Sequence, residues 1–216
     1  MKRLGILLSG RGSNFEAIAD NIAAGRLYAE IAVVIGNRQE ARGLEVATQR
    51  GFPAVCLPSK GLDREVYDRQ LVQELKSRQV DLVCLAGFMR LLSAHFVREF
   101  PQRILNIHPS LLPAFPGMDA QKQALDYGAK ITGCTVHFVD EHLDHGAIIL
   151  QKTVPVLDSD DVHTLSARIL EQEHSAYSEA IGLILSGDLE VVERRVLRKR
   201  GRSEARSSEA RSLEES

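Results

Sequence analysis

The sequence contains only three cysteines, and their positions argue against two kinds of site. Cys56, Cys84 and Cys134 are far apart, and no two of them form a Cys-x-x-Cys pair. A disulfide framework or a thiolate zinc site uses paired cysteines at short, regular spacings, which this sequence does not supply. We therefore expect a protein of the reduced cytoplasm.

Long apolar runs are also absent. A membrane-spanning helix needs about 20 consecutive apolar residues, and no stretch of this sequence approaches that length. Met1-Lys2-Arg3 imitates the basic start of a signal peptide, but the apolar run after it already stops at Ser9-Gly10. That short run predicts a buried strand, and we expect no membrane partner.

The chain has little net charge of either sign. Its 27 Lys and Arg residues against 29 Asp and Glu residues give a formal charge of −2. Such a chain has no strong overall field to attract nucleic acid or anionic lipid. We therefore expect small-molecule substrates, no nucleic-acid partner, and a monomer or weak homodimer.

The 216 residues, 44% of them apolar, suffice for one well-buried core and are few for two. Short apolar runs without polar alternation alternate with helix-period segments, which predicts a Rossmann-like α/β fold with a mostly parallel twisted sheet and helices on both faces. The predicted buried strands are Leu4–Leu8, Ile31–Ile35, Ala54–Leu57, Leu82–Leu85 and Ile104–Ile107. On one predicted helix Tyr67, Leu71 and Leu75 share a face, while Asp68 faces elsewhere.

The order of elements changes after Pro116-Gly117. The sequence predicts, in turn, a short helix near Gln121–Tyr127, a strand Thr132–Phe138, a loop Asp140–Gly146, a strand Ala147–Val154 and a long helix Val162–Leu185. Residues 1–193 are therefore interpreted as one catalytic domain.

The last segment, residues 194–216, differs in composition from the rest. It holds eight Arg and Lys residues against four Glu, a charge of +4, and repeats SEARS at Ser203–Ser207 and Ser208–Ser212. With almost nothing apolar to bury, it is predicted to be a disordered tail or a marginal exposed helix. The preceding 193 residues therefore carry a formal charge of −6, which together with the +4 of this segment gives the total of −2.

A glycine-containing loop joins the first predicted strand to the first predicted helix. In Ser9-Gly10-Arg11-Gly12-Ser13-Asn14, glycines let the backbone approach a ligand, and free N–H groups at a helix start attract anions. The loop lacks the glycine pattern of dinucleotide sites and the Gly-Lys-Ser/Thr of triphosphate sites, which favours a phosphate monoester. A tight turn capped by Ser13 or Asn14 is an equally good interpretation.

Asn106 and His108 close the fifth predicted strand, and their spacing of two places both side chains on one side of it. An amide beside an imidazolium can stabilise the oxyanion of acyl transfer. Asp144 is the candidate carboxylate that would orient His108 and favour its charged form. The alternative is a buried His and Asn that satisfy a strand end, and sequence distance does not show that His108 and Asp144 touch.

Five segments in the same order resemble the folate-dependent formyltransferases, and among them the phosphoribosylglycinamide formyltransferases. They are Ser9–Asn14, Ala86–Leu92, Leu105–Pro113 (LNIHPSLLP), Val136–Phe138 and Leu143-Asp144. The resemblance runs from about residue 3 to about residue 190 and implies the formyltransferase fold. It also implies an enzyme of purine biosynthesis that transfers the formyl group of 10-formyltetrahydrofolate to the amine of glycinamide ribonucleotide, with no metal.

The resemblance also implies roles for individual residues. Asn106, His108 and Asp144 would be catalytic, with His108 as the proton donor. The ribonucleotide would be held by Gly12, Ser13, Asn14 and Glu173. The folate would be held by Arg64, Met89, Arg90, Leu91, Leu92, Asn106, Asp140 and Glu141.

Several of these residues have plainer interpretations. Met89, Leu91 and Leu92 could be core residues at a strand end. Arg64 and Glu173 could be solvated helix charges. His137, on a predicted strand, is interpreted as a structural histidine.

The sequence departs from the family pattern at two places. Asp119 and Gln121 stand where some relatives carry histidines, and His145 replaces a glycine common beside Asp144. These changes bear on the charge and flexibility of the loops near the folate. His142 and His145 have a spacing typical of metal ligands, which His108 or Asp144 could join, but an activated metal hydroxide would favour hydrolysis and nothing else demands a metal.

Three other functions fit parts of the pattern. Formyltetrahydrofolate deformylases resemble the same Asn-His-Asp core, but they usually carry an extra N-terminal domain and lack the glycine loop. Methionyl-tRNA formyltransferase needs a C-terminal RNA-binding domain, for which the residues after Glu193 are too few. A nucleotide-binding regulatory module would use the glycine loop and leave the triad without a purpose.

Overall fold

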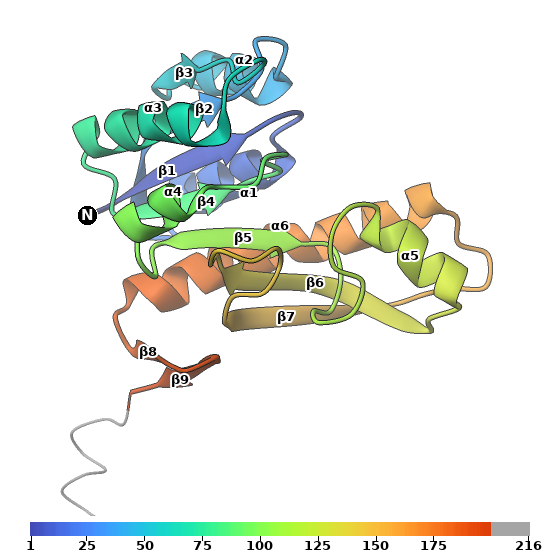
Figure 1. Ribbon diagram of the computed structural model, residues 1–216. Helices are drawn as coiled ribbons and strands as arrows, with labels where there is room; N and C mark the ends of the chain where they lie inside the picture. The colour runs from blue at the N-terminus through green and yellow to red at the C-terminus, as the bar shows by residue number, and fades with distance from the viewer. Residues whose placement is uncertain (200–216) are drawn as a thin grey trace, which may run out of the picture.

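The structure, a computed structural model, describes residues 1–199 and contains one nine-stranded sheet in the order β3-β2-β1-β4-β5-β6-β7-β9-β8 (Figure 1). The strands are β1 (Lys2–Leu8), β2 (Ala29–Gly36), β3 (Ala54–Cys56), β4 (Leu82–Leu85), β5 (Ile104–His108), β6 (Ile131–Phe138), β7 (Ile148–Pro155), β8 (Leu189–Val192) and β9 (Arg195–Arg198). The helices are α1 (Ser13–Ala23), α2 (Arg42–Gln49), α3 (Arg64–Ser77), α4 (Ala94–Glu99), α5 (Ala120–Tyr127) and α6 (Val162–Leu185).

The sheet has a parallel half and an antiparallel extension. Strands β1 to β5 pair in parallel, whereas β6 runs antiparallel to β5, and β7 antiparallel to β6. The prediction of an α/β fold with a mostly parallel sheet is therefore confirmed. The change of direction falls at β5, the strand that carries Asn106 and His108.

Helices cover both faces of the sheet, as the buried, non-alternating strands predict. On β1, Leu4, Ile6 and Leu8 enter the core beneath α1, α2 and α6, while Leu7 enters the core beneath α3 and α4. In Figure 1 the long helix α6 passes behind β5, β6 and β7. On β5, Leu105 and Ile107 enter the α6 side, which leaves Asn106 and His108 on the opposite side.

Asp68 is a correction to the predicted face of α3. Tyr67, Leu71 and Leu75 are buried as expected, but Asp68 is buried with them. Its Oδ2 accepts a hydrogen bond of 2.5 Å from the backbone N–H of Ser93, the residue that caps α4. A buried carboxylate is tolerated there because it satisfies a backbone donor at a helix start.

The C-terminal hairpin is a second correction. The predicted tail begins at residue 194, yet Arg195–Arg198 form β9 and pair antiparallel with β8. Val191 and Val196 pack against the core on the α6 side, so backbone pairing and two valines hold a segment whose composition alone predicted no structure. The SEARS repeats lie outside the described residues, and none of the helices in residues 1–199 is long and apolar enough to cross a membrane.

Candidate active site

The predicted site segments lie at the carboxyl ends of three neighbouring parallel strands, and therefore at one edge of the sheet. The glycine loop follows β1, residues 86–92 follow β4, and Asn106 and His108 end β5, in the spatial order β1-β4-β5. The loops are joined, since Ser9 N–H donates to Gly87 O at 3.0 Å and Ser9 Oγ accepts from Met89 N–H at 2.8 Å. Carboxyl ends of parallel strands are the usual ligand edge of such sheets.

The structure brings His108 and Asp144 together. His108 Nδ1 lies 3.4 Å from Asp144 Oδ2, and both side chains are buried. The other ring nitrogen of His108, Nε2, lies 2.8 Å from the carbonyl oxygen of Phe115. Each ring nitrogen of His108 thus faces an oxygen atom, and these two contacts fix the orientation of the ring.

Two glycines place the Asp144 loop. Gly117 N–H donates to Asp144 Oδ2 at 2.8 Å, which ties the loop after β5 to the loop after β6. At Gly146 an added Cβ would lie 1.8 Å from Phe138 O, so only glycine lets the loop return this tightly against β6. Asp144 itself has φ 50°, an uncommon conformation for a non-glycine residue, and its carboxylate contacts hold it there.

Asn106 is oriented by His137. His137 Nδ1 lies 2.7 Å from Phe138 O and must donate there, which leaves Nε2 to accept from Asn106 Nδ2 at 3.2 Å. Burial lowers the pKa of His137 and keeps the ring neutral. Both ring nitrogens of His137 are thus hydrogen-bonded, and among the described residues the second N–H of the Asn106 amide has no partner.

The glycine loop leaves the start of α1 open. Within the described residues no side chain caps α1, and its N-cap is Gly12 at φ 80°. The alternative of a turn capped by Ser13 or Asn14 is therefore wrong. A Cβ at Gly12 would lie 2.9 Å from Gly43 Cα, so glycine is required both for its φ and for this close approach.

Glu173 is not a solvated helix charge. It is buried on α6, and its Oε2 accepts from Asn14 Nδ2 of α1 at 2.8 Å. Burial raises the pKa of Glu173, while the bond from Asn14 partly opposes that rise. The structure thus joins two of the residues predicted to bind the ribonucleotide.

The segment after β4 is exposed and apolar. Met89 and Leu91 are 66% and 49% exposed, so the interpretation of these two as core residues is wrong, whereas Leu92 packs against the core on the α3 side. Arg90 lies over the ring of Tyr67, 4.8 Å from its centroid, and donates to Ser59 O at 3.3 Å. Two exposed apolar side chains on such an anchored segment offer a surface to a flat ring.

The remaining predicted folate residues are dispersed. Arg64, the first residue of α3, lines a surface pocket of about 390 Å³ with Ser93 and Ala94, and none of Asn106, His108 and Asp144 lines that pocket. Asp140 accepts from the backbone N–H of His142, and Glu141 lies 3.6 Å from Arg98. The structure thus places Asp140 and Glu141 on the Asp144 loop and Arg64 beside the start of α4.

Comparison with known proteins decides the family, because residues 2–181 match the formyl transferase family. The chain belongs to the formyl transferase family. It is similar to phosphoribosylglycinamide formyltransferase of Escherichia coli (strain K12), with 42% identity over 189 residues that cover 87% of this chain and 89% of that protein. It is also similar to glycinamide ribonucleotide transformylase 1 from Symbiobacterium toebii, whose crystal structure matches with a TM-score of 0.90, 49% identity and coverage of 93% and 95% of the two chains.

A longer protein shares the same region. Trifunctional purine biosynthetic protein adenosine-3 of Drosophila melanogaster is 50% identical over 189 residues, which are 86% of this chain and 14% of that protein. The formyl transferase chain thus spans about a seventh of the length of this trifunctional relative.

Sequence reasoning missed the residues that support this formyl transferase site. Thr135 Oγ1 donates to Ser110 O at 2.7 Å, and Gln151 Nε2 donates to Leu112 O at 2.9 Å, so both fix the segment after His108. Tyr177 OH lies 3.0 Å from the carbonyl oxygens of Leu85, at the end of β4, and of Leu105, near the start of β5. Polar residues inside apolar strands are the only sequence signal that could have marked Thr135 and Gln151.

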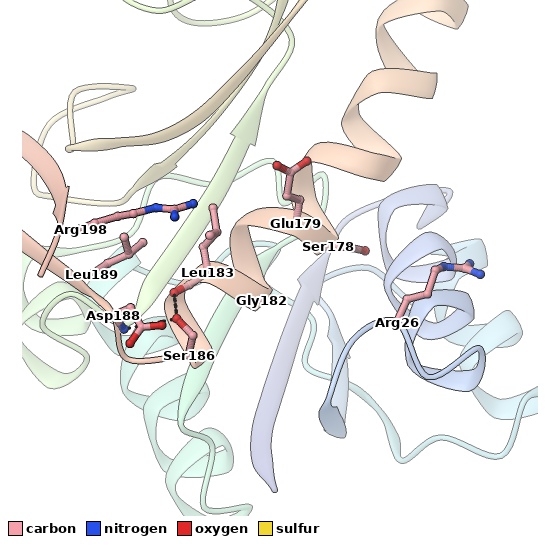
Figure 2. Close-up of a pocket in the computed structure, with 9 residues that line it drawn as sticks. All are labelled: Arg26, Ser178, Glu179, Gly182, Leu183, Ser186, Asp188, Leu189 and Arg198. Carbon is pink, nitrogen blue, oxygen red and sulfur yellow. Dashed lines mark hydrogen bonds between the residues drawn. The ribbon is translucent and has the colours of Figure 1, made fainter. Parts of the chain in front are cut away.

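A separate pocket of about 380 Å³ lies between the C-terminal half of α6 and the β8–β9 hairpin (Figure 2). In Figure 2, Arg26 approaches from the α1–β2 connection, and Leu189 and Arg198 come from the hairpin. None of the residues predicted for catalysis or substrate binding lines it. This pocket is therefore separate from the predicted site residues at the sheet edge.

Proposed function

We propose that the chain transfers the formyl group of 10-formyltetrahydrofolate to the amine of glycinamide ribonucleotide, giving formylglycinamide ribonucleotide and tetrahydrofolate in purine biosynthesis. The observation that carries the proposal is the shared sheet edge. An open helix start after β1 and the Asn106–His108–Asp144 cluster at β5 lie two strands apart, about 10 Å. Phosphate, ribose and glycinamide together can bridge such a gap.

The ribonucleotide fits the β1 end. Backbone N–H groups at Gly12, Ser13 and Asn14 would bind the phosphate, because free donors at a helix start attract an anion. Glu173, held by Asn14, would accept hydrogen bonds from the ribose or the glycinamide part. Its burial favours a small polar ligand that restores its lost hydration.

The folate fits the β4 and β5 ends. Exposed Met89 and Leu91 would contact its ring, and the backbone of residues 89–92 would pair with its polar edge. Asp140 and Glu141 on the Asp144 loop would complete the site, which positions the formyl group beside Asn106. Arg64 belongs to the same proposal, and it lines a pocket at the start of α4.

The proposed reaction moves one electron pair onto the formyl oxygen and transfers one proton to the folate nitrogen. The amine lone pair attacks the formyl carbon, the carbonyl electrons move to oxygen, and the amide N–H of Asn106 with an N–H of His108 stabilises the oxyanion. Collapse of this intermediate breaks the bond to the folate nitrogen, which gains a proton as the former amine loses one. Asp144 would orient the His108 ring, and His108 Nε2 would exchange Phe115 O for a substrate atom.

A single assay tests the acceptor. The purified chain is given 10-formyltetrahydrofolate with glycinamide ribonucleotide, with formylatable tRNA, or with no acceptor, and release of tetrahydrofolate is followed. We expect release that depends on glycinamide ribonucleotide. Release at the full rate without an acceptor would identify a deformylase and overturn the proposal, and release that depends on tRNA would overturn it equally.

The cytoplasmic location, the division into a catalytic domain that includes the β8–β9 hairpin and a C-terminal tail after it, and a monomeric or weakly dimeric state belong to the same proposal. The family match supports the first part of this division, since it covers residues 2–181. Sedimentation analysis of the purified chain at several concentrations tests the oligomeric state.

A further inference from the structure

The loop between β6 and β7 gathers a second group of chemically capable side chains next to the catalytic trio. The ligand atoms of Asp140, His142 and His145 all lie within 4.8 Å of one another. His145 Nδ1 is 2.8 Å from Asp140 Oδ2, and His142 Nδ1 is 3.9 Å from Asp140 Oδ1. The proposed formyl transfer uses neither histidine.

These three groups suit a transition-metal ion. Imidazole nitrogens and a carboxylate oxygen bind zinc at about 2.0–2.2 Å, so donors around a tetrahedral ion lie roughly 3.3 Å apart. The two distances from Asp140 to the histidines bracket that value. The side chains of His142 and His145 are 76% and 52% exposed, so small rotations can complete the geometry, and water can take the fourth position.

The backbone already shapes the loop around Asp140. His142 N–H donates to Asp140 Oδ1 at 2.9 Å, which folds the chain back toward this carboxylate. The rings of His142 and His145 lie 5.1 Å apart, centroid to centroid. The sequence offered the two histidines with His108 or Asp144 as partners, whereas the fold supplies Asp140 instead.

A cation of the protein competes for the same donors. Arg194, at the turn between β8 and β9, donates from Nη2 to His145 O at 2.6 Å and places Nη1 3.0 Å from His145 Nδ1. A guanidinium thus already occupies the side of the His145 ring that a metal ion would approach. Metal binding would require Arg194 to move.

We propose that Asp140, His142 and His145 form a binding site for one divalent transition-metal ion, with zinc the best match to its ligands. The ion would take no part in the formyl transfer itself, since His108 and Asp144 lie outside the ligand set, whereas Asp140 also belongs to the proposed folate site. It would still act on the site, because Asp144 stands between two ligands in the chain and its carboxylate contacts Gly117 N–H and His108. A bound ion would hold the loop on both sides of Asp144.

Zinc titration tests the site directly. Tag-free full-length chain, stripped with a chelator and dialysed, is titrated with Zn²⁺ by calorimetry and with Co²⁺ by visible absorption. We expect one ion per chain and the absorption of four-coordinate Co²⁺. His142→Ala, His145→Ala and Asp140→Asn should each weaken binding by at least about tenfold.

Two further variants sharpen the test. His163→Ala removes an exposed histidine from the first turn of α6, outside the cluster, and should leave zinc binding unchanged. Arg194→Gln removes the competing guanidinium and should tighten binding by up to about fivefold, the range of a surface ion pair.

Two measurements distinguish zinc binding at the proposed site from binding at another ligand and from misfolding of a variant. Cys56 is an exposed thiol, so zinc binding that is lost in Cys56→Ser and retained in His142→Ala would overturn the proposal. Zinc should raise the thermal midpoint of the parent chain and of Cys56→Ser, but not of folded His145→Ala, because only a ligand that binds the native state shifts it. Equal zinc binding by the parent chain and all three ligand variants would refute the site.

Discussion

At the scale of single residues, the environment of each polar side chain gives it a distinct task. Asn106 is oriented by neutral His137, His108 lies between the Asp144 carboxylate and the Phe115 carbonyl, and Glu173 is buried with Asn14. In each case a buried polar side chain has a polar partner, which offsets the free-energy cost of removing it from water.

Asp144→Asn tests the pairing with His108. The amide can still accept from Gly117 N–H, but the carboxylate that lies 3.4 Å from His108 Nδ1 is lost. We expect turnover to fall by roughly 10²–10³-fold, as for loss of a preorganised oxyanion partner, with substrate binding retained. Steady-state kinetics across pH measure this, with Asp158→Asn, an exposed carboxylate paired with Lys130, as the control. An unchanged rate and pH profile in Asp144→Asn would show that the pairing has no catalytic role.

Glu173→Gln separates stability from binding. Burial raises the pKa of Glu173 above its ordinary value of 4.5, so its charged form destabilises the fold increasingly as pH rises above that value. A glutamine keeps an acceptor for Asn14 Nδ2 and can donate to Asn14 Oδ1, a buried atom without a hydrogen-bond partner among the described residues.

The variant should therefore be more stable at pH 7 by about 1 kcal/mol, with the gain vanishing below about pH 4.5. Denaturant unfolding at several pH values measures it. The Michaelis constant for the ribonucleotide should rise at the same time, because the carboxylate is lost. Lower stability at pH 7 would contradict the assigned burial effect.

At the scale of elements, the connection from β1 to α1 is the most demanding turn of the molecule. Gly12 combines φ 80° with a close approach to Gly43 on α2, and it leaves the first N–H groups of α1 open. A local backbone requirement and a proposed binding function thus coincide at one glycine.

Gly12→Ala should distort that connection. A Cβ would meet backbone atoms, which cannot rotate away, and a left-handed conformation disfavours alanine by about 1–2 kcal/mol. We expect lower stability and weaker ribonucleotide binding, measured by denaturant unfolding and by calorimetric titration of the ribonucleotide. Ser13→Ala, which adds no strain, should weaken only ribonucleotide binding, and an effect confined to folate would contradict the assignment of the phosphate.

At the scale of the whole molecule, the parallel half and the antiparallel extension contribute different parts of the site. The parallel strands present the glycine loop, the 87–92 segment and the end of β5, whereas the loop between β6 and β7 brings Asp144 back over that edge. The centre therefore forms only when both halves of the sheet are assembled.

Truncation tests how far the fold extends. A chain that ends at residue 199 keeps the β8–β9 hairpin, whereas one that ends at residue 193 loses β9 and the packing of Val196 against the core. The free energy of unfolding of the shorter chain should be lower by about 1–2 kcal/mol, because the burial of one apolar side chain and one strand pairing are lost. Thermal and denaturant unfolding of the two chains measure the difference, and equal stability would place the boundary at residue 193.

The sequence by itself determined the architecture and the chemical candidates. Buried strands lack polar alternation, and helices carry one apolar face, so the order of β and α segments and the parallel sheet follow from local periodicity. The pair Asn106 and His108 follows from the same rule, since residues two apart on a strand share a side. Resemblance to a family then supplied Asp144, Glu173 and the folate residues, which spacing does not reveal.

Only the tertiary structure decided which of these candidates meet. His108 and Asp144 are 36 residues apart in the chain and 3.4 Å apart in space, because β6 folds back beside β5 and glycines turn its loop inward. Helical periodicity misplaced Asp68 and composition misplaced residues 195–198, because a buried carboxylate and a short hairpin are held by partners distant in sequence. Local pattern fixes what each segment can be, whereas long-range contacts fix what it touches, and the chemistry of this chain depends on the contacts.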